Sequence, residues 1–366
     1  MIEQKNKTTL IIDGNWLLMS RLGIMMKNFV NTLPPEHLEQ AKREIIDFVA
    51  QSINKTINFW GNYIDNIIMV QDGGSWRKQI AKPKLYDGDY KGNRIPDTNI
   101  AWNYVWDALR TICEFLKENN ISCIHESNIE GDDWCWYWSR YLNHEGINCI
   151  IWSSDADLKQ LVQRKNGAWT IWYNDKAGLV LPKSLHYSDM DILMNFEAVD
   201  PFIEEITKKT NSITYINPDD IVMMKVICGD AGDNIKSIMR YEKITKSGKK
   251  QVVQVSKKEW EKVKTRLDIH NIKDFIQKKI NIIKYLKCTK RFKNYKESVE
   301  DIAEMFDFNL ILVRLHRDSI PQASIDLMNL HKDEYKIADI NFIKNNYKVL
   351  AQHEESVEKL FEDLPF

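Results

Sequence analysis

Short apolar runs alternate with longer amphipathic stretches over the first half of the chain. The runs "TLIID", "NIIMVQD", "ISCIHES", "NCIIWSSD" and "AWTIWY" are short and rich in β-branched or aromatic residues, which predicts strands. Apolar residues at helical spacing between residues 38–60 and 102–116, and in "DDWCWYWSRYL", predict helices. Strands that alternate with helices of this length predict an α/β fold whose mostly parallel sheet carries helices on both faces.

The pattern changes after about Pro201, where helical spacing continues without regular strand alternation and lysine becomes frequent. We therefore expect a first domain over residues 1–200 and a helical second domain over 201–348. The last residues, 349–366, are acidic and follow the last long periodic segment, so we expect a loosely ordered tail.

Acidic residues follow four of the predicted strands. In a parallel sheet the carboxyl ends of the strands meet at one edge, and ligands bind in the crevice outside that edge. We therefore expect the acidic side chains there to converge. The acids are Asp13, Asp72, Glu130 with Asp132 and Asp133, and Asp155 with Asp157.

Carboxylates at one edge repel each other unless a cation lies between them. Mg²⁺ or Mn²⁺ prefers oxygen ligands, and two such ions about 4 Å apart can activate water and stabilise the leaving oxygen of a phosphodiester. A single pair such as Asp155 and Asp157 is more often a helix cap or a solvated turn. Acids after four strands together favour a site for two Mg²⁺ or Mn²⁺ ions.

The net charge of −1, from 51 Lys and Arg against 52 Asp and Glu, does not by itself indicate a polyanionic partner. The distribution is uneven, because residues 236–266 carry many Lys and Arg and few acids. The polar N-terminus and the lack of a long apolar run predict a cytoplasmic protein without a membrane span. The six cysteines form no CxxC pair and are expected to be buried, reduced thiols.

Four stretches resemble the flap endonuclease and 5′-3′ exonuclease family, most closely the RNase H branch from T-even bacteriophages. They occur in the family's order and cover roughly residues 10–238. The resemblance implies a PIN-like 5′-nuclease fold, a helical arch at about 73–125 and a helix–three-turn–helix in the second domain. The stretches are "IIDGNWLLMSR", "DGGSWRKQIAKPKLYDGDYKGNR", "IEGDDWCWYWSRYLNHEGINCIIWSSDADLKQLV" and "ICGDAGDNIKSI".

By this resemblance, two sets of carboxylates fall on the family's metal positions. Asp230 and Asp233 are implied by the family alone, because the argument from strand ends does not reach them. The first set is Asp13, Asp72, Glu130, Asp132, Asp133 and Asp155, and the second-metal side is completed by Asp157, Asp230 and Asp233. Asp155 is also expected to be essential for catalysis.

The stretch "YKGNR" lies in the family's arch, through which single-stranded 5′ ends pass. Lys91 and Arg94 match basic positions that steady the scissile phosphate, and Tyr90 matches an aromatic that can stack on a base. Arg77 and Lys78 are expected to contact nucleic acid beside them. The alternative is a solvated loop with a glycine turn.

The stretch "GDAGDNI" resembles the family's helix–three-turn–helix, which grips duplex phosphates and often binds K⁺. The usual Pro-Gly turn is replaced here by "KSIMRYEKITKSGKK", so the K⁺ site stays open. Lys236, Arg240 and Lys243 remain candidate phosphate contacts. In "WCWYWSRYL" the residues Trp134, Trp138 and Leu142 repeat at helical spacing, which favours core packing over a stacking surface.

The ending "FEDLPF" resembles the acidic tip of bacterial single-stranded-DNA-binding proteins. We hypothesise that Asp363, Pro365 and Phe366 form a docking peptide for replication proteins, and an inert tail is the alternative.

These observations predict a Mg²⁺-dependent, structure-specific 5′-3′ nuclease that removes RNA primers and 5′ flaps during DNA replication. The expected partners are DNA and RNA–DNA hybrids with 5′ ends, flaps or forks, with single-stranded-DNA-binding or other replisome proteins as candidates. A monomer is expected, in the host cytoplasm if the gene is a phage's. The alternatives are a PIN-type ribonuclease and a catalytically silent protein that binds DNA junctions.

Overall fold

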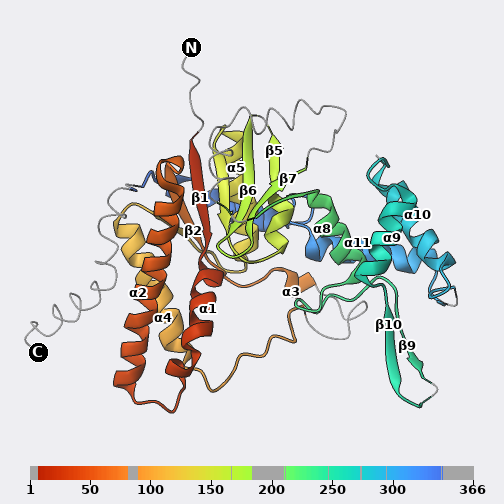
Figure 1. Ribbon diagram of the computed structural model, residues 1–366, viewed down its shortest axis with the longest axis horizontal. Coiled ribbons are helices and arrows are strands. Elements are labelled where there is room, and N and C mark those ends of the chain that lie inside the picture. The colour runs from red at the N-terminus through yellow and green to blue at the C-terminus, as the bar shows by residue number, and fades with distance from the viewer. Residues whose placement is uncertain are drawn as a thin grey trace, which may run out of the picture.

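The central feature is a mixed sheet with strand order β3-β2-β1-β4-β6-β7-β8, to which β5 adds by pairing with β6 (Figure 1). The computed structural model describes residues 7–80, 90–165, 167–183, 210, 212–245, 247–272, 274–293, 295–338 and 340. The strands are β1 (Thr8–Asp13), β2 (Asn66–Val70), β3 (Ser122–Ile124), β4 (Asn148–Trp152), β5 (Gln163–Lys165), β6 (Ala168–Asn174), β7 (Gly178–Pro182) and β8 (Ile213–Ile216).

Most of the strand pairs in this sheet are parallel. β1 pairs with β2 and β4, β2 with β3, β4 with β6, and β7 with β8, all in parallel. β6 runs antiparallel to β5 and β7. The carboxyl ends of β1, β2 and β4 therefore lie at one edge, as the strand pattern predicted.

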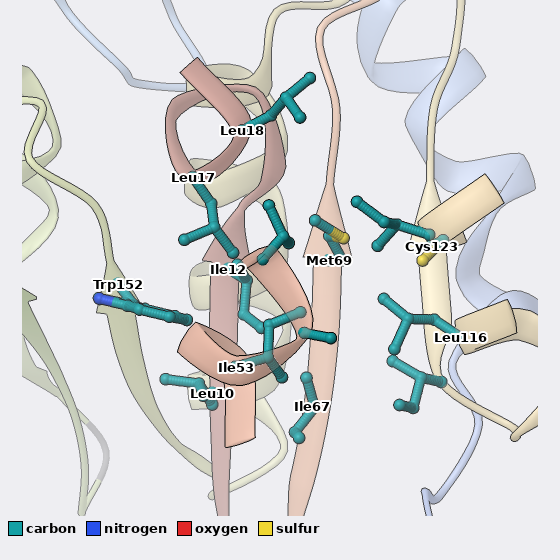
Figure 2. Close-up of a cluster of buried hydrophobic side chains, with 14 of the residues drawn as sticks. Leu10, Ile12, Leu17, Leu18, Ile53, Ile67, Met69, Leu116, Cys123 and Trp152 are labelled. Carbon is teal, nitrogen blue, oxygen red and sulfur yellow. The ribbon is translucent and has the colours of Figure 1, made fainter. Parts of the chain in front are cut away.

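Helices cover both faces of the sheet, so the strands are buried on both sides. One face packs on α1 (Gly14–Met25), α2 (Pro35–Trp60) and α4 (Trp102–Glu118). Figure 2 shows this layer, in which Leu10 and Ile12 of β1 meet Leu17 and Ile53. The intervening residue of β1, Ile11, packs on the other face, against α5 (Gly131–His144) and α12 (Gln322–Leu330). The predicted fold class is confirmed.

A second core lies in the part of the chain that follows β8. It is built from helices and one hairpin, and its centre includes Trp260, Phe292 and Phe306. The elements are α8 (Pro218–Cys228), β9 (Arg240–Ile244), β10 (Lys250–Gln254), α9 (Lys257–Leu267), α10 (Phe275–Cys288) and α11 (Val299–Val313).

Three strands after residue 201 were not predicted. β8 is short and lies at the edge of the first sheet, and β9 and β10 form an antiparallel hairpin. The hairpin residues are mostly exposed, four of the ten are charged, and only Val253 among them is buried, so no apolar run marks the hairpin. Short elements complete the described helices: η1 (Met26–Phe29), η2 (Gly61–Tyr63), α3 (Arg77–Ile80), η3 (Asp157–Leu161) and η4 (Lys332–Glu334).

The chain returns to the first sheet near its end. Leu315, Ile325 and Met328 pack beside α5, and the backbone of residues 334–338 bonds to Asn66 and Ser122. The boundary expected at 200/201 and the expected tail, 349–366, lie outside the described residues. The division into domains therefore stays a prediction.

All six cysteines are free thiols, of which Cys288 alone is exposed. Among the described helices, none combines the length and apolar character that crossing a membrane requires.

Candidate metal centre and nucleic-acid interface

Asp13 ends β1 and begins α1. Its Oδ1 accepts a hydrogen bond from the Trp16 amide at 2.9 Å, and its Oδ2 accepts one from Ser153 Oγ, just past β4, at 2.8 Å. Burial, with the nearby charges of Asp72 and Asp155, raises the pKa of Asp13 to about 7. This carboxylate is held at the sheet edge in a position where ionisation is costly without a cation.

Asp72 and Asp132 lie beside Asp13 at the amino end of α5. The Gly131 amide, in the first turn of α5, donates to Asp72 Oδ1 at 2.5 Å, so the helix begins against this carboxylate. Burial raises the pKa of Asp72. Burial raises the pKa of Asp132 more strongly, and the charges of Asp155 and Asp13 raise it further. Asp13, Asp72, Asp132 and Asp155 thus form one group of mutually repelling carboxylates, here called the first carboxylate cluster.

Glu130 and Asp133 are instead neutralised by protein cations. The guanidinium of Arg77 contacts Glu130 Oε2 at 2.5 Å and Asp133 Oδ1 at 2.9 Å, and Lys91 pairs with the other oxygen of Glu130. Although burial opposes it, Arg77 and Lys91 hold the pKa of Glu130 below its usual value. Both acids also cap α5, since each side chain bonds to the other's backbone amide. They support the first carboxylate cluster by fixing the start of this helix.

Arg77 does not have the position expected of a nucleic-acid contact. Its side chain is only 2% exposed, and its Nε donates to the Leu312 carbonyl at 2.9 Å. The prediction that it binds nucleic acid is corrected, because every polar contact of its guanidinium is made inside the protein. Its neighbour Lys78 is exposed.

The segment 90–94 docks on the loop that follows α8. The Lys91 amide donates to the Asp233 carbonyl at 3.0 Å, and Asn93 Nδ2 donates to the Ala231 carbonyl at 2.7 Å. Arg94 Nη2 contacts Asp233 Oδ1 at 2.5 Å, while its side chain stays 57% exposed. Two motifs far apart in sequence, "YKGNR" and "GDAGDN", thus form one surface. This juxtaposition was not predicted.

Tyr90 also differs from its prediction. It is 3% exposed, packs in the second core and donates from its hydroxyl to Asp233 Oδ2 at 3.2 Å. A ring buried this way cannot stack on a base, so the expected stacking role is corrected. Of the predicted arch, 73–125, residues 81–89 lie outside the described part, and α4 packs in the core of the first sheet.

Asp157, Asp230 and Asp233 form a second carboxylate cluster. One oxygen of each lies within 4.8 Å of the others. Burial and the charge of Asp155 raise the pKa of Asp157 to about 6. Three converging oxygen donors of this kind fit a hard divalent cation. The structure brings together the residues that the family resemblance assigned to the second metal.

Lys225 of α8 was missed by the sequence reading. Its ammonium forms ion pairs with both Asp157 and Asp230. The sequence feature that could have identified it is a single lysine in the otherwise apolar run "IVMMKVIC". With Arg94 on Asp233, the second carboxylate cluster is therefore already paired with two positive charges.

A cavity of about 500 Å³ adjoins the second carboxylate cluster and is lined by Asp230, Lys225, Lys236, Arg240 and Lys257 among others. We call it the basic cavity. Two of the predicted phosphate contacts, Lys236 and Arg240, line it, and the third, Lys243, is exposed on the hairpin. Asp363, Pro365 and Phe366 lie outside the described residues.

Fold and site together define an α/β protein with two groups of carboxylates at a sheet edge and a basic surface beside them. Residues 8–188 match the sequence profile of the family described as "5′-3′ exonuclease, N-terminal resolvase-like domain". This part of the chain is therefore similar to the 5′-3′ exonuclease family.

The relatives include a 5′-3′ exonuclease of Mycoplasmopsis pulmonis (strain UAB CTIP). It is 26% identical over 235 residues, which are 64% of this chain and 63% of the relative, so the match spans less than two thirds of that protein. The fold is similar to that of the T5 D15 protein co-crystallised with metal ions and of the T5 5′-exonuclease with bound zinc. In each case the TM-score is 0.51 and the identity 16%, over 94% of this chain and 100% of the other.

Proposed function

We propose that this chain is a 5′-3′ nuclease that depends on two Mg²⁺ or Mn²⁺ ions and hydrolyses phosphodiesters in DNA and RNA–DNA hybrids with 5′ ends, flaps or forks. The observation that carries the proposal is the pairing of two carboxylate clusters around Asp155, whose charge raises the pKa of Asp13 in one cluster and of Asp157 in the other.

The first carboxylate cluster and the second would each hold one cation. When bound, divalent cations of this kind activate a water molecule and stabilise the leaving oxygen of a phosphodiester. Asp13 is oriented for this by Ser153 and the Trp16 amide, and Asp72 by the Gly131 amide. The amino end of α5 also favours negative charge beside these groups.

Lys91 and Arg94, both in the predicted arch, are cations that lie against these carboxylates without being fully buried. In the structure they neutralise Glu130 and Asp233. A phosphate that enters between the clusters would compete for them, and Arg94 is exposed enough to turn toward it. We propose that both steady the scissile phosphate.

The basic cavity is the proposed anchor for the duplex part of the substrate. Lys225, Lys236, Arg240 and Lys257 line it, and contacts of this kind to backbone phosphates give affinity without reading sequence. That property suits an enzyme that recognises a junction. By extension we propose removal of RNA primers and 5′ flaps during replication, in the cytoplasm of the cell.

Two other functions compete with this one. A PIN-type ribonuclease would share the sheet and the first carboxylate cluster but has no need of the loop that carries Asp230 and Asp233. A silent junction-binding protein would have no reason to keep mutually repelling acids together, which costs folding free energy.

One assay separates the three. The purified chain is incubated with a 5′-labelled flap, an RNA–DNA hybrid and a single-stranded RNA, each with Mg²⁺ or with EDTA. We expect Mg²⁺-dependent release of short 5′ products from the flap and the hybrid. Cleavage of single-stranded RNA alone would favour the ribonuclease. Binding that needs no metal, without any cleavage, would falsify the proposal.

A further inference from the structure

A second cationic cavity lies at the opposite edge of the sheet from the carboxylates. It has a volume of about 270 Å³ and lies between the end of α5, β5 and the turn after α11. We call it the far-edge cavity. Five basic side chains line it, and none of its described lining residues is a carboxylate: Arg140, His144, Lys165, His316 and Arg317.

The far-edge cavity is separate from the proposed active site. Arg140 comes ten residues after Glu130, which is about 15 Å along the axis of α5. Lys165 pairs with Ala168 at the start of β6, whereas the carboxylates follow the ends of the parallel strands β1 and β4. A ligand here would not touch either carboxylate cluster.

Arg140 is the central observation. Its Nη1 donates to the Leu161 carbonyl at 3.1 Å, and within the described ranges no carboxylate pairs with it. Burial lowers its pKa to about 10. A guanidinium that is desolvated and lacks a counter-ion is costly, so the site is incomplete without an anion.

The other cations converge on the same space. Besides burial, the charges of Arg314, Arg140 and Lys165 lower the pKa of His316, although Asp318 opposes them. Glu145 and Asp318 contact His144 and His316 at 3.1 and 3.2 Å, but neither lines the cavity. Among the described residues, Arg140, Lys165 and Arg317 thus give the cavity a positive charge that no carboxylate in its lining cancels.

The walls of the far-edge cavity are fixed by hydrogen bonds. Gln160 ties the turn after α11 in place, because it donates to the Val313 carbonyl at 3.1 Å and accepts from the Leu315 amide at 2.8 Å. Asn143 donates to the Trp169 carbonyl and accepts from Gln163. A preorganised site of this size is smaller than the roughly 300–1,000 Å³ of pockets for drug-sized ligands, and it suits a small anion.

We propose that the far-edge cavity binds a phosphate group through the guanidinium of Arg140, with Lys165 and Arg317 at its rim. A planar guanidinium matches the geometry of a phosphate, with which it can form two parallel hydrogen bonds. The phosphate comes either from a free nucleoside monophosphate or from a nucleic-acid chain. The inference does not depend on the proposed nuclease activity.

The first test is a titration of the full chain with inorganic phosphate, followed by ³¹P line broadening, with EDTA present to keep divalent ions from the carboxylates. Potassium chloride at equal ionic strength is the reference. We expect saturable binding that Arg140→Gln weakens about tenfold or more, since hydrogen bonds to charged groups are strong. The double variant Lys165→Gln/Arg317→Gln, at two exposed positions, should weaken phosphate binding too. It allows the proposal to be tested even if Arg140→Gln does not fold.

Two control variants exclude other sites. Lys236→Gln/Arg240→Gln removes charge from the basic cavity, and Arg43→Gln removes an arginine whose guanidinium contacts Gln40 on α2. Lys236→Gln/Arg240→Gln should keep the component of phosphate binding that Arg140→Gln removes, and Arg43→Gln should bind phosphate as the unaltered chain does. Without phosphate, Arg140→Gln should melt at the same temperature or higher, because a half-buried charge without a carboxylate partner is gone, whereas loss of a purely structural arginine would lower the melting temperature.

The source of the phosphate is separated by repeating the titration with adenosine monophosphate and with a single-stranded oligonucleotide. Weakening of the nucleotide alone by Arg140→Gln would indicate a free ligand, and weakening of both would indicate a chain phosphate. The proposal is overturned if phosphate acts no differently from chloride, or if Lys236→Gln/Arg240→Gln removes the binding.

Discussion

Asp155 has a place in both carboxylate clusters, since its charge acts on Asp13, Asp132 and Asp157. We expect Asp155→Asn to reduce cleavage of a flap substrate to background. Duplex affinity in EDTA should stay within a factor of about three, because the basic cavity is untouched. Cleavage rates and filter binding on the same preparation measure the two effects. Asp333→Asn, at an exposed position of η4, is the control. Residual cleavage at near-normal rate would contradict the proposed role.

Arg77 tests the support beneath the site. Arg77→Ala leaves the buried Asp133 without its cation and Glu130 with Lys91 alone, and we expect a loss of about 3–5 kcal/mol in the free energy of unfolding. Lys78→Ala, one residue further along and exposed, should change it by less than about 0.5 kcal/mol. Urea unfolding followed by tryptophan fluorescence measures both. Equal effects of the two substitutions would show that the ion pairs do not stabilise the fold.

Lys225 tests the second carboxylate cluster. Its ammonium lies where a cation would meet Asp157 and Asp230, so Lys225→Met should tighten Mn²⁺ binding by about tenfold or more. Titration followed by electron paramagnetic resonance counts free Mn²⁺ directly. Lys159→Met is the control, because that ammonium lies 4.3 Å from the centroid of the Trp172 ring instead. Unchanged or weaker Mn²⁺ binding in Lys225→Met would exclude competition between the lysine and the metal.

For single residues, the sequence predicted the positions of the carboxylates better than the positions of the basic and aromatic side chains. Asp13, Asp72, Asp132 and Asp155 could be placed because strand ends in a parallel sheet share an edge, and that rule needs no knowledge of tertiary contacts. Arg77 and Tyr90 could not, because their partners Leu312 and Asp233 are distant in sequence. Basic and aromatic residues look alike in a sequence whether they face solvent or a buried carboxylate.

Among the elements, the loop after α8 depends on Gly229. This residue has φ +78°, and an added Cβ would lie 2.4 Å from the Ile235 carbonyl oxygen. We expect Gly229→Ala to cost about 1–3 kcal/mol and to weaken duplex binding, since the loop carries Asp230 and Asp233. Gly23→Ala in α1, where nothing lies within 4 Å, should instead be neutral or stabilise by about 0.5–1 kcal/mol. Thermal melts and duplex-binding assays compare the two variants. Unchanged stability and unchanged duplex binding in Gly229→Ala would refute the argument.

Lys236 lines the basic cavity together with Arg240 of the hairpin, so a substitution there tests whether the cavity binds duplex phosphates. Lys236→Ala should weaken duplex binding about equally for all sequences, and the slope of log affinity against log salt should fall by about one. Lys27→Ala, at an exposed position of η1, should leave the slope unchanged. Fluorescence anisotropy at several salt concentrations gives both slopes. An unaltered slope in Lys236→Ala would mean that the basic cavity does not hold backbone phosphates.

The hairpin β9–β10 shows why some elements escape prediction. The segment "KSIMRYEKITKSGKK" departs from the family pattern, and the sequence alone indicated only a basic stretch. Its outer face bears Arg240, Ile244 and Lys250, so the alternation of buried and exposed residues that marks a strand is nearly absent. Pairing between the strands, rather than burial, defines it.

For the molecule as a whole, the sheet of the first region was predictable because its strands are buried on both faces and read as apolar runs. The return of the chain to that sheet was not. β8 adds an edge strand, and residues 315–340 complete the layer around α5 through contacts with Asn66 and Ser122. Such long-range pairing leaves no periodic signal in either partner.

That return has a consequence for how the chain is made. The strands from β1 to β7 leave the ribosome with part of one face uncovered until residues near 340 emerge. At about 5–20 residues per second, synthesis from the end of β7 to residue 340 takes roughly 10–30 s. During that interval apolar residues such as Trp134 and Trp138, which are fully buried in the finished protein, lack their neighbours from α12 and Tyr335. A nascent chain stalled at residue 300 should therefore be cleaved by protease within α5 and recruit chaperones, and release of the next forty residues should end both.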